Sequence, residues 1–184
     1  MKISNIEKII FPLIVVVLLL TNIYFWYSMR NSQKDLENSI AYVEGLEKLT
    51  GISRLGSTHE HADLKIYVDS IPVDLSQQKY QLKSKFIHVE DGDGDVIHKH
   101  AKGVTLGMFF RTIGIEFKKN CLTIDDKKYC NSGNKKIRMF VNGKEIEEFE
   151  DYEFKSLDKI LITYGNSTDS EISRQIKTVT NKAN

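Results

Sequence analysis

The chain begins with a long uncharged hydrophobic run, which limits how the rest can fold. Residues 9–27, IIFPLIVVVLLLTNIYFWY, include 19 positions without a charged side chain. As a helix this run would be about 28 Å long, close to the roughly 30 Å hydrocarbon core of a bilayer. The alternative is a cleaved signal peptide, but no small-residue cleavage site follows before Arg30. We therefore predict a retained signal anchor.

The predicted orientation of this anchor rests on two cysteines far from it in the sequence. Lys2 and Lys8 precede the run and a similar pair of basic residues follows it, so the positive-inside count is almost a tie. Cys121 and Cys130 are enough for one disulfide, which persists in an oxidising compartment. We therefore predict a single-pass cell-membrane protein with a cytoplasmic N-terminus and residues 28–184 outside.

The part of the chain after the anchor is electrically balanced. The sequence contains 26 basic and 25 acidic side chains, and setting aside Lys2, Glu7 and Lys8 leaves equal numbers beyond residue 27. A nucleic-acid surface needs an excess of Lys and Arg to neutralise phosphates. The expected partners are the lipid bilayer and other subunits of a membrane complex, without nucleic acid.

Changes in periodicity divide the chain into four segments. Residues 1–30 are the cytoplasmic tip and transmembrane anchor. Residues 31–58 form a stalk helix, with apolar side chains at helical spacing, and a glycine-containing linker. Residues 59–165 form an extracytoplasmic domain. Residues 166–184 are polar without clear periodicity, so we expect a mobile tail.

The pattern of residues 59–165 predicts an α+β domain. Alternating apolar residues and turn signals predict strands at 59–68, 86–90, 96–100, 137–141 and 159–164. Thr105 can cap a helix with an apolar stripe, and Gly114 can end it in a left-handed conformation. The expected fold is a small mixed β-sheet with one packed helix.

All histidines of the protein fall in one window: His59, His61, His88, His98 and His100. On a strand, residues i and i+2 share a face about 7 Å apart, so the imidazoles of an H-x-H pair can converge on one ion. If the hairpin closes over the DGDGD sequence with Glu90 opposite Val96, His88 lies across from His98 and near His100. The pattern thus predicts three imidazoles on two neighbouring strands.

This grouping makes the histidines candidate metal ligands. Three converging imidazoles satisfy a zinc site, with His88, His98 and His100 as the core ligands and His59 and His61 as additional ones. Neutral imidazole suits a divalent transition metal, Zn or Cu. Two alternatives stay open, namely the solvated face of amphipathic strands and a pH-sensing surface.

The DGDGD loop at residues 91–95 also permits a calcium interpretation. An EF-hand would require glycine and glutamate where Val96 and Lys102 stand, so we interpret the loop as a hairpin turn.

No separate catalytic signature accompanies the histidines. We therefore favour a metal-binding module over an enzyme. The alternatives are an accessory subunit of a membrane complex, a thiol–disulfide enzyme, and a zinc-dependent enzyme in which Glu90 or Glu60 acts as base.

Cys121 and Cys130 enclose LTIDDKKY, which predicts a hairpin over Asp125-Asp126. This turn places the cysteines opposite each other at a separation that permits a disulfide. A structural bridge is predicted. The alternative is a redox-active pair, although the spacing is not Cys-x-x-Cys.

Four stretches resemble a poorly characterised group of archaeal membrane-anchored extracytoplasmic proteins. They are HEHAD from residue 59, HKHAKGVTLGMFF from residue 98, and VNGK with DKILITYG from residues 141 and 158. The resemblance covers roughly residues 57–165. Members are sometimes labelled protein-disulfide isomerase, which implies thiol–disulfide exchange. The VNGK and DKILITYG stretches also resemble strands of β-grasp proteins, which implies a small mixed sheet crossed by one helix.

Overall fold

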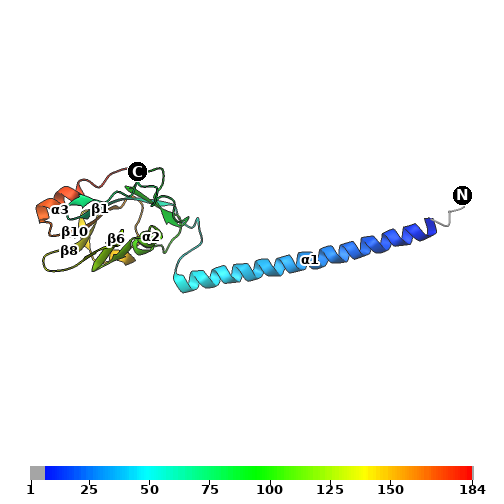
Figure 1. Cartoon of the computed structure of the whole chain (residues 1–184). Coiled ribbons are helices and arrows are strands. Elements are labelled where there is room, and N and C mark those ends of the chain that lie inside the picture. The colour runs from blue at the N-terminus through cyan, green and yellow to red at the C-terminus, as the bar shows by residue number, and fades with distance from the viewer. Residues whose placement is uncertain (1–6, 184) are drawn as a thin grey trace. The chain divides into compact units, whose positions relative to one another are not determined.

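The computed structural model describes residues 7–183 and consists of two compact units that meet between Thr50 and Gly51 (Figure 1). The first unit is the single helix α1, Glu7–Thr50, in which Pro12 is accommodated. Its segment from Ile10 onward has a window of mean hydropathy 2.1 and is long and apolar enough to cross a membrane. The helical part of the expected stalk continues α1 without a break.

The second unit is built on a seven-stranded sheet in the order β3-β4-β1-β10-β8-β9, with β2 paired to β1. β1 runs parallel to β10, and the other pairings in this sheet are antiparallel. The predicted α+β class is therefore correct. The strands are β1 (Glu60–Val68), β2 (Ile71–Pro72), β3 (Ile87–His88), β4 (Val96–Lys99), β8 (Lys136–Val141), β9 (Lys144–Ile146) and β10 (Lys159–Gly165).

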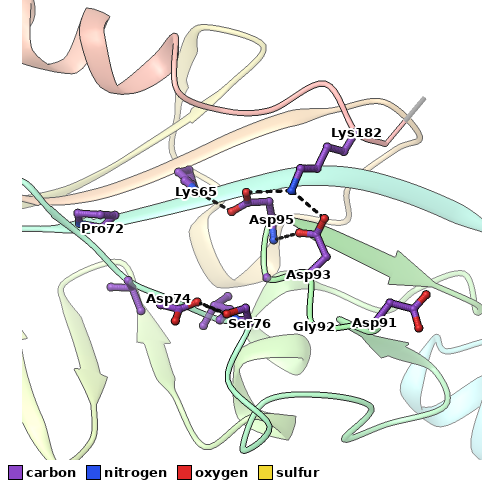
Figure 2. A pocket seen from close by; sticks show the side chains of 12 residues that line it. Lys65, Pro72, Asp74, Ser76, Asp91, Gly92, Asp93, Asp95 and Lys182 are labelled. Atoms are coloured by element: carbon purple, nitrogen blue, oxygen red, sulfur yellow. Dashed lines mark hydrogen bonds and ion pairs between the residues drawn. The ribbon is translucent and has the colours of Figure 1, made fainter.

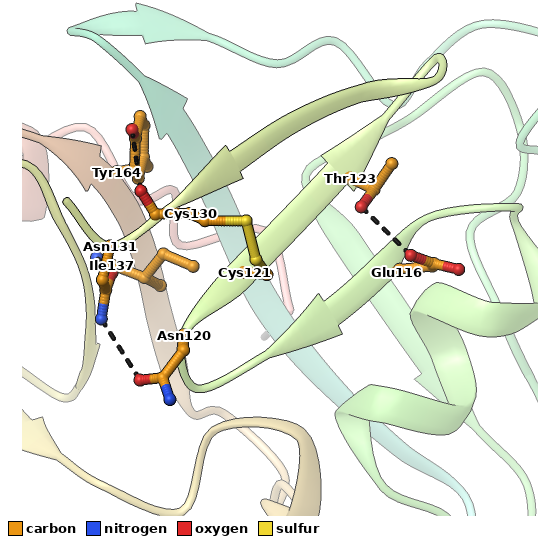
Figure 3. Close-up of a disulfide and its surroundings, with 8 residues drawn as sticks. All are labelled: Glu116, Asn120, Cys121, Thr123, Cys130, Asn131, Ile137 and Tyr164. Atoms are coloured by element: carbon orange, nitrogen blue, oxygen red, sulfur yellow. Dashed lines mark hydrogen bonds between the residues drawn. A yellow bond between two sulfur atoms is a disulfide. The ribbon is translucent and has the colours of Figure 1, made fainter.

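A second, three-stranded antiparallel sheet carries the disulfide (Figure 3). It comprises β5 (Glu116–Lys118), β6 (Cys121–Ile124) and β7 (Lys127–Cys130). Cys121 pairs with Cys130 across the β6–β7 hairpin and the two are bonded, as predicted. The Tyr164 hydroxyl on β10 donates to the Cys130 carbonyl at 3.2 Å. The bridge thus fixes a hairpin that is attached to the main sheet.

The main core lies between one face of the seven-stranded sheet and helix α2, Leu106–Thr112. Thr105 and Gly114 flank this helix as expected, with Gly114 at φ 74°, although the Thr105 side chain makes no capping hydrogen bond. Phe109 and Phe110 are fully buried against Ala62, Leu64, Ile66 and Ile97 of β1 and β4. A short 3₁₀ helix, η1 (Phe149–Asp151), packs against α2.

The C-terminal segment, which was expected to be a mobile tail, packs on the opposite face of the sheet. Residues 166–183 are not a mobile tail, because they contain helix α3, Asp169–Ile176, with a complete capping box between Thr168 and Glu171. Ile172 and Val179 are buried with Tyr67, Phe140 and Leu161 in a second, smaller core. The hydrophobic residues of this amphipathic segment are few, and the long polar stretches around them concealed its periodicity.

Candidate metal centre

Three adjacent strands place histidines in one row across the main sheet. His61 on β1 pairs with His98 on β4, and His98 pairs with His88 on β3. Because paired residues project to the same face, the three imidazoles stand side by side. The predicted opposition of His88 and His98 is correct. The row lies on the face opposite the Phe109 and Phe110 core.

A second row completes the cluster one step along the same face. His59 directly precedes β1 and His100 directly follows β4. The ring centroid of His59 is 4.7 Å from that of His100 and 4.8 Å from that of His61. The ring centroids of His61 and His98 are 4.4 Å apart. The ring centroid of His88 lies 5.6 Å from that of His98 and 5.1 Å from that of His100. The structure therefore brings all five predicted histidines together.

Within this cluster, His59, His61 and His98 come closest to a ligand set. Their candidate ligand atoms lie within 4.8 Å of one another, and the Nε2 atoms of His59 and His61 are 2.8 Å apart. Two nitrogens bound to one tetrahedral zinc are about 3.3 Å apart, so small side-chain rotations suffice to enclose an ion. The expected core set was His88, His98 and His100. The structure instead brings the ligand atoms of His59 and His61 closest to those of His98.

Glu90 connects the rings of the first row. One carboxylate oxygen, Oε2, lies 3.3 Å from Nε2 of His88, and Oε1 lies 3.5 Å from Nδ1 of His98. With Nδ1 of His98 turned to a carboxylate, Nε2 is the nitrogen available to an ion. Carboxylates that hold the second nitrogen of a metal-bound histidine fix its tautomer and orientation. Glu90 can give His98 this support.

Three imidazoles of the cluster favour their neutral, metal-binding form. Burial lowers the pKa of His61, His98 and His100 below the ordinary value of 6.5, and neighbouring imidazoles lower these pKa values further. The negative charge of Glu90 partly opposes the shift at each of the three. Only a neutral imidazole has a lone pair for a metal, so the fold prepares these side chains for coordination.

Known proteins add nothing to this geometry. A scan of family models and searches of curated proteins and of solved structures find no match to the chain.

A buried lysine with two partly exposed carboxylate partners lies beneath the histidines on the core side of the sheet. Lys99 is 1% exposed, pairs with Glu60 across β1 and β4, and places Nζ 3.1 Å from a carboxylate oxygen of each of Glu60 and Glu153. Nζ also donates to the Phe154 carbonyl at 2.5 Å. Glu60 and Lys99 are the middle residues of HEH and HKH, so their attraction holds together the two strands that present four of the histidines.

Sequence reasoning missed this pair, although a signal was available. The two H-x-H pairs have opposite charges at their central positions, which must face away from the histidines on a strand. Once the two strands are taken as neighbours, Glu60 and Lys99 become partners on the core side. A lysine inside the core was not expected because lysine is rarely buried without a partner.

The DGDGD loop forms the rim of a polar pocket of about 470 Å³ (Figure 2). Lys182 reaches from the C-terminal segment to Asp93 at 2.8 Å and Asp95 at 3.4 Å, while Lys65 lies 2.5 Å from Asp95. Two ammonium groups therefore already neutralise these carboxylates. This arrangement supports the hairpin-turn interpretation of the loop and gives no support to calcium.

The pKa shifts predict that acid destabilises the metal-free domain. The unfolded chain binds protons at its histidines near pH 6.5, whereas the folded state resists protonation of His61, His98 and His100. Stability therefore falls as the pH drops through about 6.5. We expect a lower melting temperature at pH 5.5 than at pH 7.5, measured with chelator present. The decrease should be smaller in a His61→Gln, His98→Gln variant; an equal decrease would contradict this assignment.

Proposed function

We propose that the protein is a membrane-anchored module that binds a divalent transition metal at its strand-borne histidines. The observation that carries this proposal is the convergence of His59, His61 and His98, whose candidate ligand atoms lie within 4.8 Å of one another. A polar sheet face has no physical need for five imidazoles in contact, since neighbouring rings gain little from one another in water. A shared ion supplies the missing attraction.

The ligand chemistry favours Zn²⁺ or Cu²⁺. Imidazole nitrogen is a good ligand for both ions, and three histidines leave a fourth position on zinc for water or another group. His59 is exposed while His61 and His98 are half-buried, so an ion can reach the site from solvent. An accessible site on the surface suits capture and transfer of metal better than permanent burial.

The proposed location is the outer face of a cell membrane. Supporting this, α1 is long and apolar enough to span a bilayer, and Cys121 and Cys130 form a disulfide, which requires an oxidising compartment to persist. We place the N-terminus of α1 in the cytoplasm and residues 28–184 outside. The histidines would then meet metal ions arriving from outside the cell.

We further propose that the metal-binding unit is a β-grasp-like domain. The strand order β4-β1-β10-β8-β9, with β1 parallel to β10 and α2 between β4 and β8, supports this assignment. The fold does not itself imply the function. Its relevance is that β1 occupies a central position, so the first H-x-H pair rests on a rigid strand.

The proposal is tested by metal binding to the tag-free full-length chain in detergent. We expect stable Zn²⁺ binding, and a loss of affinity at this site of more than about 100-fold in a His61→Gln, His98→Gln variant, because losing two of three ligands costs more than losing an outer hydrogen-bond partner of a ligand, which costs about 10–100-fold. A Lys127→Gln, Lys128→Gln variant is the matched control, since both lysines are exposed on the β6–β7 hairpin. Absence of binding by the unaltered chain would overturn the proposal and leave an accessory role in a membrane complex.

A further inference from the structure

Three metal-binding groups of the cluster lie outside the triad. They are His88, His100 and Glu90, and each borders a member of the triad. His88 is 7% exposed and is the most buried histidine of the five. The ring of His100 lies 5.1 Å from that of His88 at an interplanar angle of 27°. The backbone of His100 is fixed on both sides, by hydrogen bonds to the Phe86 carbonyl and from the Gly56 amide.

The contact between His88 and Glu90 places two electron-rich atoms next to each other. Nδ1 of His88 lies 2.8 Å from the Ser84 carbonyl oxygen, which can only accept, so Nδ1 carries a proton. In the neutral ring, Nε2 is then a lone-pair acceptor. This acceptor faces a carboxylate oxygen of Glu90 at 3.3 Å. Two acceptors at this distance repel each other unless a cation lies between them, either a proton on the ring or a metal ion.

The separation of these two atoms fits a shared ion. Two ligand atoms about 2.0–2.1 Å from a tetrahedral zinc are about 3.3 Å apart, and Nε2 of His88 and Oε2 of Glu90 are separated by 3.3 Å. Nδ1 of His88 is already held by the Ser84 carbonyl, which is the outer support typical of a metal-bound histidine. The ring of His100, 5.1 Å from that of His88, is the neighbouring imidazole that would complete the ligand set.

We propose that the cluster binds a second divalent ion, held by His88, His100 and Glu90. This inference rests on the proposed function, because it extends the same histidine cluster. Glu90 links the two ions: Oε2 binds the second ion, while Oε1 supports Nδ1 of His98, a ligand of the first.

The number of ions per chain tests this inference. The tag-free full-length chain in detergent is loaded with Zn²⁺, desalted and analysed for metal and protein. We expect two zinc ions per chain in the unaltered protein and one in a Glu90→Gln variant and in a His88→Gln variant. Glutamine keeps the size of these side chains and some of their hydrogen bonds. The Lys127→Gln, Lys128→Gln variant should retain two.

The possible counts distinguish failure of this inference from failure of the proposed function. One ion per unaltered chain would overturn the second site and leave the first. No bound ion would overturn both. Two ions in the unaltered chain and still two in both the Glu90→Gln and His88→Gln variants would overturn the assignment of these ligands.

Loading with Cu²⁺ provides a second readout that does not depend on the quantity bound. Two Cu²⁺ ions held within one cluster broaden each other's electron paramagnetic resonance signal through magnetic coupling. We expect this broadened spectrum in the unaltered chain and the sharp signal of an isolated Cu²⁺ in the Glu90→Gln variant. A sharp signal from a fully loaded unaltered chain would place the ions too far apart for this cluster.

Discussion

Lys99→Ala is expected to lower the free energy of unfolding of the domain by about 2–4 kcal/mol, because it removes a buried side chain and the donor to a buried carbonyl. Lys99 is 1% exposed, and its ammonium group lies 3.1 Å from Glu60 and from Glu153. Without it, Glu60 keeps a negative charge at the edge of the core. The Phe154 carbonyl also loses its donor, and the lost side chain leaves a cavity.

Urea denaturation of the full-length protein in detergent, followed by the tyrosine circular dichroism signal, measures this loss. Lys128→Ala is the matched control, because Lys128 is exposed on β7 and its replacement should change stability by less than about 0.5 kcal/mol. Lys99→Met keeps most of the side-chain volume but removes the positive charge. It should therefore recover part of the lost free energy of unfolding. If Lys99→Ala behaves like the control, the ion pair does not hold β1 and β4 together.

The elements that the sequence predicted well are those with a strong local signal. The Asp125-Asp126 turn has both residues in the left-handed region, at φ 48° and 63°, and this geometry brings the cysteines into register. The DGDGD hairpin likewise fixed the opposition of His88 and His98. Turn length determines register in a hairpin, so these contacts followed from short sequence distances.

Contacts between distant strands could not be predicted in the same way. The parallel pairing of β1 with β10, almost 100 residues later, has no turn that fixes it. The pairing of β1 with β4 decides which histidines form the closest set, and it brings His61 opposite His98. From the sequence alone the first H-x-H pair had no defined neighbour. The histidine cluster was therefore predicted correctly as a group, but its closest triad was not.

The C-terminal segment shows a related limit. Its buried residues Ile172 and Val179 have few apolar neighbours in the sequence, so composition favoured a tail. Its structure depends on a partner, since a carboxylate on β1 accepts hydrogen bonds from residues more than 100 positions away. No local pattern reports such a contact.

That partner, Asp63, provides the second large expected effect. It is 2% exposed and accepts hydrogen bonds from the Thr180 hydroxyl, from the Lys182 amide at 2.9 Å and from the Ala183 amide at 3.3 Å. Hydrogen bonds to a charged group contribute about 1.5–3 kcal/mol each. Asp63→Ala removes all three, but the released donors regain water, so we expect a loss of about 4 kcal/mol, somewhat below the summed contributions.

The same change should release the C-terminal segment before the rest of the domain unfolds. Hydrogen exchange distinguishes release of the segment from unfolding of the whole domain. The amides of Lys182 and Ala183 should lose protection while those of β10 keep it. Asp151→Ala, at an exposed position of η1, is the control and should alter neither. Since the segment packs on the same face as the histidines but farther along β1, its release would expose the Tyr67 and Leu161 side chains. Unchanged protection at Ala183 in the Asp63→Ala variant would show that Ile172 and Val179 hold the segment without the carboxylate.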